Sequence, residues 1–396
     1  MTSAHATRLR LVPMKPRDPN EPGRAASSLE LFFDLVFVVA VSISAVQLHH
    51  ALTEGHVLEG VLSYAAVFFS IWWAWMNFTW FATSFDTDDW LYRVLTIVQM
   101  GGVLVLAAGV ESAFTESDFR IVTAGYVVMR LAMVAQWLRA SHGAGPARRA
   151  TLAYAAGITI VQILWVSSLL LPGELFRVVI IALFLTELAV PVVAESRGNT
   201  PWHPHHITER YGLFTLILLG ESLLASANAI IDALGDAESL APLVGVSVLT
   251  LVVTAALWWI YFWPPHHQAI RGFRSSLVYG YGHFFVFAAA GAFSAGVEVE
   301  IDVLTGHSAL TSPAASFTYT VPVAVFIVMV WLLAIRPTAG GIVNTVVPVG
   351  AVLVLVDPVI PLPIALTAGI LTAIVAVLVW QTPEDVGRTE ELRVET

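Results

Sequence analysis

The chain has 396 residues and a net charge of −10; 57% of its residues are hydrophobic and only 12% are charged, and its mean hydropathy is +0.77. Soluble domains carry about 25% charged residues, so this composition excludes a soluble globular protein and predicts an all-α polytopic integral membrane protein. The absence of cysteine excludes disulfides, iron–sulfur clusters and thiolate zinc sites.

Functions driven by nucleotides or directed at nucleic acids are also disfavoured. Lys15 is the only lysine, so the chain has no Walker A lysine and is not expected to hydrolyse ATP by itself. Few cations lie outside the hydrophobic segments, so no nucleic-acid partner is expected.

The first 28 residues are polar and hold five cations among several prolines. No short apolar region with a cleavage site precedes the first long apolar segment. Residues 1–28 are therefore expected to form a basic cytoplasmic tail rather than a signal peptide.

Apolar runs of about 20 residues, the length that crosses a bilayer as a helix, recur along the rest of the chain. They predict twelve transmembrane helices with both termini in the cytoplasm, at 29–51, 58–81, 90–113, 119–140, 149–171, 174–194, 206–231, 241–263, 275–297, 313–335, 341–357 and 359–380. Residues 381–396 are expected to form an acidic cytoplasmic tail.

The placement of charge supports this number of helices. With the N-terminus inside, most of the 19 Lys and Arg residues fall on the inner side, as expected for a cytoplasmic face. The outer loops FTESD (114–118), DALGDAES (232–239) and EVEIDVLTGH (298–307) are acidic. If the prediction missed one helix, all later loops would change sides, and the Lys and Arg residues would no longer concentrate on one side of the membrane.

Short motifs recur in the same order in the two halves of the chain. WWAWMNFTW (72–80) resembles WWIYFW (258–263), AGVE occurs at 108–111 and 295–298, and Glu30 corresponds to Glu209. Because six helices is an even number, the halves share an orientation in the membrane. The pattern predicts two parallel six-helix repeats, at 29–194 and 195–380.

Ionisable side chains inside membrane helices cost roughly 2.5–3.5 kcal/mol each and are functional-site candidates by default. Eight such residues occur in the predicted spans or at their ends: Glu30, Asp34, Arg130, Glu187, Glu209, Arg210, Glu221 and His283. We predict that they form a transport pathway or coupling site. The alternative for each is a purely structural ion pair or hydrogen bond.

Some pairings follow from helical spacing. Glu30 and Asp34 lie one turn apart on one face, where Glu30 has the alternative of meeting headgroup water at the helix start. Asp34 lies deeper and is the better functional candidate. Arg130 is the expected countercharge of Glu221, and Glu187 competes for it.

Histidines and tryptophans give weaker signals. His206 and Glu209 form a His-x-x-Glu pair, but the H-E-x-x-H signature is absent, so no metal or cofactor is predicted and His206 is only a weak candidate ligand. His283 lies within a span, where bonding to a backbone carbonyl is its alternative. The tryptophan clusters at 72–80 and 258–263 are expected to anchor helices at the membrane interface.

Several segments together resemble the bacterial low temperature requirement A (LtrA) family over roughly residues 29–380. They are LELFFDLVFVVAVS (29–42), the central arginine of the fourth helix, HITERYGLFTLILLGES (206–222) and YGYGHFFVFAAAGAFSAGVE (279–298). The resemblance implies a multi-pass protein of the bacterial cytoplasmic (inner) membrane and no particular substrate. It places these residues at the family's motif positions: Glu30, Asp34, Arg130, His206, Glu209, Arg210, Glu221 and His283.

The leading functional hypothesis is a secondary transporter of a small solute or ion, with the lipid bilayer and the solute as partners and an oligomer possible. The first alternative is a cation or proton channel with Asp34 lining the pore, since FFDLVFVVAV is similar to the first helix of endolysosomal-type potassium and proton channels. Phe33 replaces the serine of that channel motif. The second alternative is a non-transporting membrane protein or an intramembrane enzyme linked to growth at low temperature; no enzymatic activity is predicted.

Overall fold

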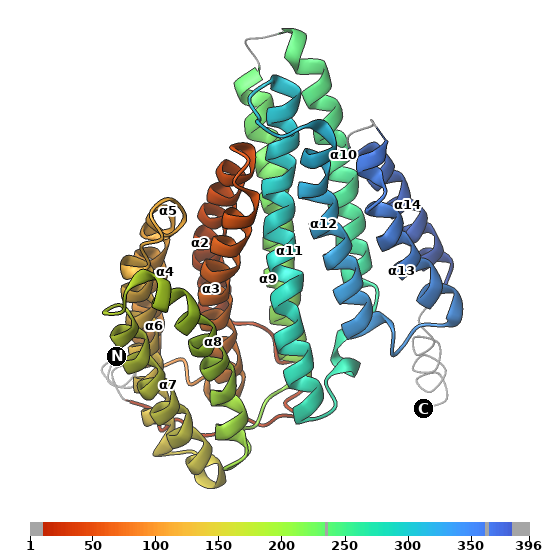
Figure 1. Cartoon of the computed structure of the whole chain (residues 1–396). Helices are drawn as coiled ribbons and strands as arrows, with labels where there is room; N and C mark the ends of the chain where they lie inside the picture. Colours follow the sequence, from red (N-terminus) through yellow and green to blue (C-terminus); the bar gives the residue numbers. More distant parts are fainter. Residues whose placement is uncertain (1–10, 234–236, 361–363, 382–396) are drawn as a thin grey trace, which may run out of the picture. The chain divides into compact units, whose positions relative to one another are not determined.

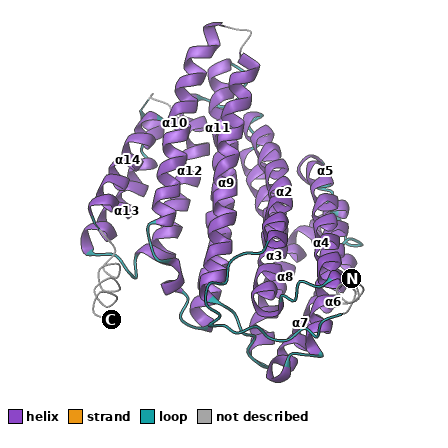
Figure 2. Cartoon of the chain, turned by 180° about the vertical axis from the view of Figure 1, so that it is seen from behind, coloured by secondary structure: helices purple, strands orange, loops and turns teal. Residues whose placement is uncertain are grey.

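The computed structural model describes residues 11–233, 237–360 and 364–381, and these ranges contain helices but no strand (Figures 1 and 2). The α-helices are α2 (Ser28–Thr53), α3 (Val57–Phe85), α4 (Trp90–Ala108), α5 (Val110–Thr115), α6 (Arg120–Ser141), α7 (Arg148–Ser168), α8 (Gly173–Glu195), α9 (Pro204–Ala233), α10 (Ala237–Phe262), α11 (Phe273–Thr305), α12 (Ser312–Val330), α13 (Gly341–Val354) and α14 (Ala365–Trp380). A π-helical turn, η3 (Trp331–Ile335), extends α12, and 3₁₀ turns form η1 (Gly145–Ala147), η2 (His266–Ala269) and η4 (Asp357–Val359).

The predicted fold class is confirmed. Within the described residues, 11 helices are long and apolar enough to cross a membrane, and α14 is a shorter apolar helix that completes the expected twelve. Their outward faces are apolar as well: Ile163, Val178 and Leu185 are each more than 60% exposed. Such faces are suited to lipid and not to water.

Two interruptions of the helices were not predicted, in addition to shifts of helix ends such as that of α11, which was predicted to end at residue 297 and ends at Thr305. The segment predicted at 90–113 is interrupted at Gly109, which separates α4 from the short α5. The last helix was predicted to begin at residue 359, whereas η4 occupies residues 357–359 and α14 begins at 365. Hydropathy is continuous through both places, so it does not reveal either break.

The chain forms two compact units, which are described separately below. Unit 1 consists of residues 1–44 and 66–210, and unit 2 of residues 45–65 and 211–396. The division into repeats at 29–194 and 195–380 stays a prediction.

Close packing in unit 1 depends on glycine. Gly102 of α4 and Gly125 of α6 lie where the two helices meet, and a Cβ on Gly125 would collide with the backbone of Leu106 and of Gly102. In unit 2, Gly296 of α11 lies in the same way against the backbone of Thr318 in α12. Small residues allow membrane helices to approach closely enough for extensive van der Waals contact.

The described part of the basic N-terminal segment, which belongs to unit 1, packs against the end of α3. Met14 is only 2% exposed, the Arg17 amide donates to the carbonyl of Ser84 over 2.9 Å, and the Arg24 guanidinium donates to the carbonyl of Ala82 over 3.0 Å. The segment was expected only as a polar tail. It covers the C-terminal end of α3.

We predict that Gly125→Ala destabilises unit 1 because the added methyl has no room between α4 and α6. Overpacking of this kind costs about 1–3 kcal/mol. Gly101→Ala is the matched control, since a Cβ at Gly101 meets no atom within 4 Å. Thermal unfolding in detergent measures both variants, and equal melting temperatures would contradict the packing argument.

Asp86, directly after α3, provides a pH test. Burial raises its pKa from 3.8 to about 6, aided by the negative charge of Glu30. Because the folded protein then holds this proton more tightly than the unfolded chain, the contribution of Asp86 to stability is present at low pH and is lost as the pH rises through this window.

Asp86→Asn is therefore expected to gain stability relative to the parent protein as the pH rises from about 4 to about 6. Asp118→Asn is the control: its hydrogen bond from Arg120 lowers the pKa of Asp118 to about 2, below the window. Unfolding followed across the window checks this, and a pH-independent difference between Asp86→Asn and the parent would refute it.

Candidate functional site

Arg210 of α9 lies fully buried in unit 1 between the two acids of α2. Its Nη1 donates to Oε1 of Glu30 over 2.8 Å, its Nη2 to Oδ1 of Asp34 over 2.5 Å and its Nε to Oδ2 of Asp34 over 3.2 Å. The four-residue spacing of the acids puts both on one helix face, so a single guanidinium fork engages both carboxylates.

Neighbouring groups complete this arrangement. Trp75 of α3 donates its indole N–H to Oδ1 of Asp34 over 2.7 Å, and the amide of Ser27 donates to Oε2 of Glu30 over 2.9 Å. His206 Nε2 lies 3.3 Å from Oε1 of Glu30. We call Arg210, Glu30, Asp34, Trp75 and His206 the Arg210 cluster. The alternative in which Glu30 meets headgroup water does not hold, because Glu30 is 1% exposed.

A second buried cluster of unit 1 forms around Glu187 of α8. Its carboxylate accepts hydrogen bonds from four side chains on three other helices: Trp73 Nε1 over 2.9 Å, Tyr126 OH over 2.8 Å, Arg130 Nη2 over 3.0 Å and Gln162 Nε2 over 3.1 Å. We call these five residues the Arg130 cluster. The countercharge of Arg130 is thus Glu187, the competitor named from the sequence, and not Glu221.

Arg130 is less completely paired than Arg210. Arg130 is 1% exposed, yet within the described residues its Nε and Nη1 have no hydrogen-bond partner. Its guanidinium carbon lies 5.6 Å from the centre of the Tyr126 ring, which is a cation–π contact. The exposed fraction and the contacts together describe a buried cation held by one carboxylate oxygen.

Helix α3 links the two clusters. Trp73 and Trp75 are two positions apart, about 200° around the helix, so their indole N–H groups reach opposite sides of it. Trp72, Trp73 and Trp75 are at most 1% exposed, and the prediction that they anchor the helix at the membrane interface is therefore wrong. The WWxW spacing, read together with the need of buried carboxylates for donors, is the signal that could have revealed this role.

The remaining candidates lie elsewhere. Glu209, half-buried, accepts a hydrogen bond from the amide of Ala26 over 3.2 Å in unit 1. In unit 2, Glu221 is half-buried, and His283 contacts the backbone carbonyl of Tyr279 through Nδ1 over 2.7 Å and the hydroxyl of Tyr261 through Nε2 over 3.1 Å. The predicted single charged site is thus resolved, in unit 1, into the Arg210 cluster and the Arg130 cluster.

No group of three or more potential ligands that could hold a metal ion occurs in the part of the chain that the structure describes. His206 is the weak candidate from the sequence. Its imidazole faces Glu30 in a cluster that already contains the Arg210 cation, whose positive charge disfavours a second cation there.

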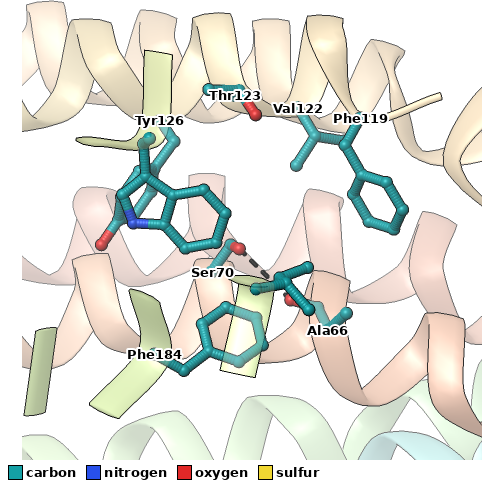
Figure 3. A pocket seen from close by; sticks show the side chains of 9 residues that line it. Ala66, Ser70, Phe119, Val122, Thr123, Tyr126 and Phe184 are labelled. Carbon is teal, nitrogen blue, oxygen red and sulfur yellow. Dashed lines mark hydrogen bonds between the residues drawn. The ribbon is translucent and has the colours of Figure 1, made fainter. Parts of the chain in front are cut away.

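A pocket in unit 1 adjoins the Arg130 cluster. It lies between helices α3, α6, α7 and α8 and is lined by Ala66, Ser70, Phe119, Val122, Thr123, Tyr126, Trp165, Ile180 and Phe184. Figure 3 shows the α6 side chains facing Ala66, Ser70 and Phe184 across the pocket. Tyr126 is part of both the pocket and the Arg130 cluster, since it lines the pocket and its hydroxyl donates to Glu187.

Sequence reasoning did not identify the pocket or its polar groups. Trp165 is 6% exposed, and within the described residues its indole N–H has no hydrogen-bond partner. Ser70 donates to the carbonyl of Ala66 over 3.2 Å. The lining is therefore mostly aromatic and apolar, with a few hydrogen-bonding groups, and the enclosed space holds about one water molecule.

We expect Arg130→Ala to destabilise the protein by about 3–5 kcal/mol, because it leaves the buried carboxylate of Glu187 without its countercharge. The paired variant Arg130→Met/Glu187→Gln removes both charges and should recover most of this loss. Denaturant unfolding in micelles measures the cycle. A double variant no more stable than Arg130→Ala would show that the ion pair is not the cause.

Comparison with known proteins gives one family. The family described as "Bacterial low temperature requirement A protein (LtrA)" matches residues 25–380. A protein of Rhizobium meliloti (strain 1021), described as "Uncharacterized protein RA0937", is 30% identical over 263 residues; the alignment covers 64% of this chain and 62% of that protein, so the chain spans less than two thirds of this relative. No solved structure matches the chain.

Proposed function

The chain belongs to the bacterial low temperature requirement A (LtrA) family, and we propose that it is a secondary transporter that moves a small solute or ion across the bacterial cytoplasmic membrane. One observation carries the proposal: a pocket inside a bundle of apolar helices leads, through Tyr126, to an arginine that is buried and only partly paired.

The two buried arginines of unit 1 differ in a way that separates structure from function. Arg210 directs Nε, Nη1 and Nη2 at carboxylate oxygens, as expected for a structural clamp. Arg130 uses only Nη2 in this way. Leaving charged donors buried without acceptors costs free energy, and such a cost is typically retained where a site acts on a ligand.

The pocket has room for about one water molecule, so its size and composition favour an ion or a solute of very few atoms. Aromatic rings of Phe119, Trp165 and Phe184 supply contact area, while Thr123 and Tyr126 supply hydroxyl groups close to the Arg130 cluster. A solute that reaches Tyr126 competes with Glu187 for its hydroxyl and thereby perturbs the ion pair. Coupling of binding to rearrangement in this way is what a transport cycle requires.

Two further points favour secondary transport over the alternatives. The chain has no Walker A lysine, so an ion or solute gradient is the available energy source. The channel hypothesis needs Asp34 to face ions, whereas Asp34 is 0% exposed and accepts hydrogen bonds from Arg210 and Trp75.

Proteoliposomes in solid-supported-membrane electrophysiology provide the test, with a panel of alkali cations, amino acids and mono- and dicarboxylates. We expect a transient current from at least one panel member, and loss of that current in Arg130→Gln/Glu187→Gln, which removes both charges and leaves the net charge of the ion pair unchanged at zero. A current that is unchanged in this variant contradicts the proposal. Unitary conductance steps in planar bilayers would favour a channel instead.

Because the chain contains no cysteine, the pocket can also be probed with single thiols. Ser70→Cys, in the pocket lining, is expected to react with a membrane-impermeant maleimide. Ile163→Cys is the control, because Ile163 is 61% exposed on the apolar outer face of α7 and should lie in lipid. An unreactive Ser70→Cys would show that the reagent does not reach the pocket from the aqueous phase and would count against a solute site there.

A further inference from the structure

Glu300, in the span of α11, is a buried acid of unit 2 that sequence reasoning did not single out. Its side chain is 0% exposed. Oε2 lies 3.5 Å from the hydroxyl of Ser316 in α12, a long contact, and Oε1 has no hydrogen-bond partner within the described residues. No Lys, Arg or His of the described ranges forms an ion pair with Glu300.

Unlike Glu300, the two neighbouring acids on α11 each pair with a histidine. Glu298 and Asp302 flank His49 of α2, with Oε2 of Glu298 3.0 Å from Nδ1 and Oδ2 of Asp302 2.6 Å from Nε2. Glu300 lies two positions from each, about 200° around the helix, and so faces away from His49. Of the three α11 acids, Glu300 is the one without a cationic partner.

A second buried carboxylate, that of Asp357 in η4, is connected to Glu300 through α12, where Ser316 contacts Glu300 and Tyr319 donates to Asp357. Asp357 is 1% exposed, and its Oδ2 accepts hydrogen bonds from the hydroxyl of Thr367, from the amide of Thr367 over 3.1 Å and from the hydroxyl of Tyr319 over 3.4 Å. These donors satisfy the hydrogen-bonding capacity of the Asp357 carboxyl group. None of them reaches Glu300.

Glu300 therefore has one long hydroxyl contact, a second oxygen without a donor and no cationic partner within the described residues. An uncompensated carboxylate in a low-dielectric interior is so costly that such a group takes up a proton. Ser316 and Tyr319 lie between the two acids on α12: Ser316 contacts Glu300, and Tyr319 donates to Asp357. Hydroxyl groups in this position are able to relay a proton.

We propose that Glu300 is a proton-binding site and that its proton is the coupling ion of the transport described above; the second part rests on the proposed function. The step is a simple proton transfer. Oε1 accepts a proton from hydronium, which leaves water, and the carboxyl group becomes neutral; release of the proton to water restores the carboxylate and hydronium. The charged or titratable groups facing Glu300 are Asp357 and Tyr319, while Glu298 and Asp302 face His49.

Infrared difference spectroscopy tests proton binding without any transport assay. The spectrum of the parent protein minus that of Glu300→Gln, at neutral pH, is expected to show the C=O band of a protonated carboxyl group. The spectrum of Glu298→Gln, the matched control on the same helix, should contain the same band as the parent protein. In the spectrum of Glu300→Asp, which keeps a carboxyl group, the band should be present at a shifted frequency. A difference spectrum with only ionised carboxylate bands overturns the proposal.

Coupling is tested in proteoliposomes loaded with the pH indicator pyranine, to which the panel solute that gives a current is added. Proton uptake through Glu300→Gln is expected to fall to the rate of protein-free liposomes, while Glu298→Gln stays at the parent rate. Uptake that is unchanged in Glu300→Gln overturns the coupling role.

The two proposals fail separately. A missing protonated-carboxyl band together with a current that depends on Arg130 and Glu187 removes Glu300 and leaves the transport function standing. The band without any such current removes the transport function and the coupling role together, and leaves the proton site.

Discussion

A charge placed inside a membrane protein must find its countercharge within the protein, because neither lipid nor bulk water supplies one. The architecture of unit 1 follows this constraint. Arg210 ties α9 to α2 through two carboxylates, and Arg130 ties α6 to α8 through one. Hydrophobic association contributes little between helices surrounded by lipid, so these polar contacts and the glycine-mediated packing of α4 and α6 specify which helices are neighbours.

Helix α3 shows how one element serves both clusters. Trp73 and Trp75, two positions apart, present their N–H donors to opposite sides, so Glu187 and Asp34 each receive an indole hydrogen bond. Displacing α3 would remove one hydrogen-bond donor from each of these two carboxylates. The aromatic density of this helix thus satisfies buried charges instead of anchoring the protein in the headgroup region.

The transmembrane helices could be predicted from the sequence because length and hydropathy are local properties, and eleven of the segments recur as long apolar helices in the described ranges. The partner of Arg130 could not be predicted in this way. Glu187 and Glu221 are equally deep in the sequence pattern, and only the packing of α6, α7 and α8 brings Glu187 to Arg130. Glu300 escaped notice for a similar reason: it was assigned to an acidic outer loop, whereas α11 continues to Thr305 and buries it.

In Arg210, Nε, Nη1 and Nη2 all donate to carboxylate oxygens. In Arg130 only Nη2 does so, and the central claim is that its Nε and Nη1 bind the solute. A density map from electron cryomicroscopy of the protein in lipid nanodiscs, prepared with a solute that gives a current, tests this contrast most directly. The account predicts non-protein density within hydrogen-bond distance of Nε or Nη1 of Arg130 and none at Arg210. Protein oxygen atoms enclosing every nitrogen of Arg130, with the solute bound elsewhere, would contradict it.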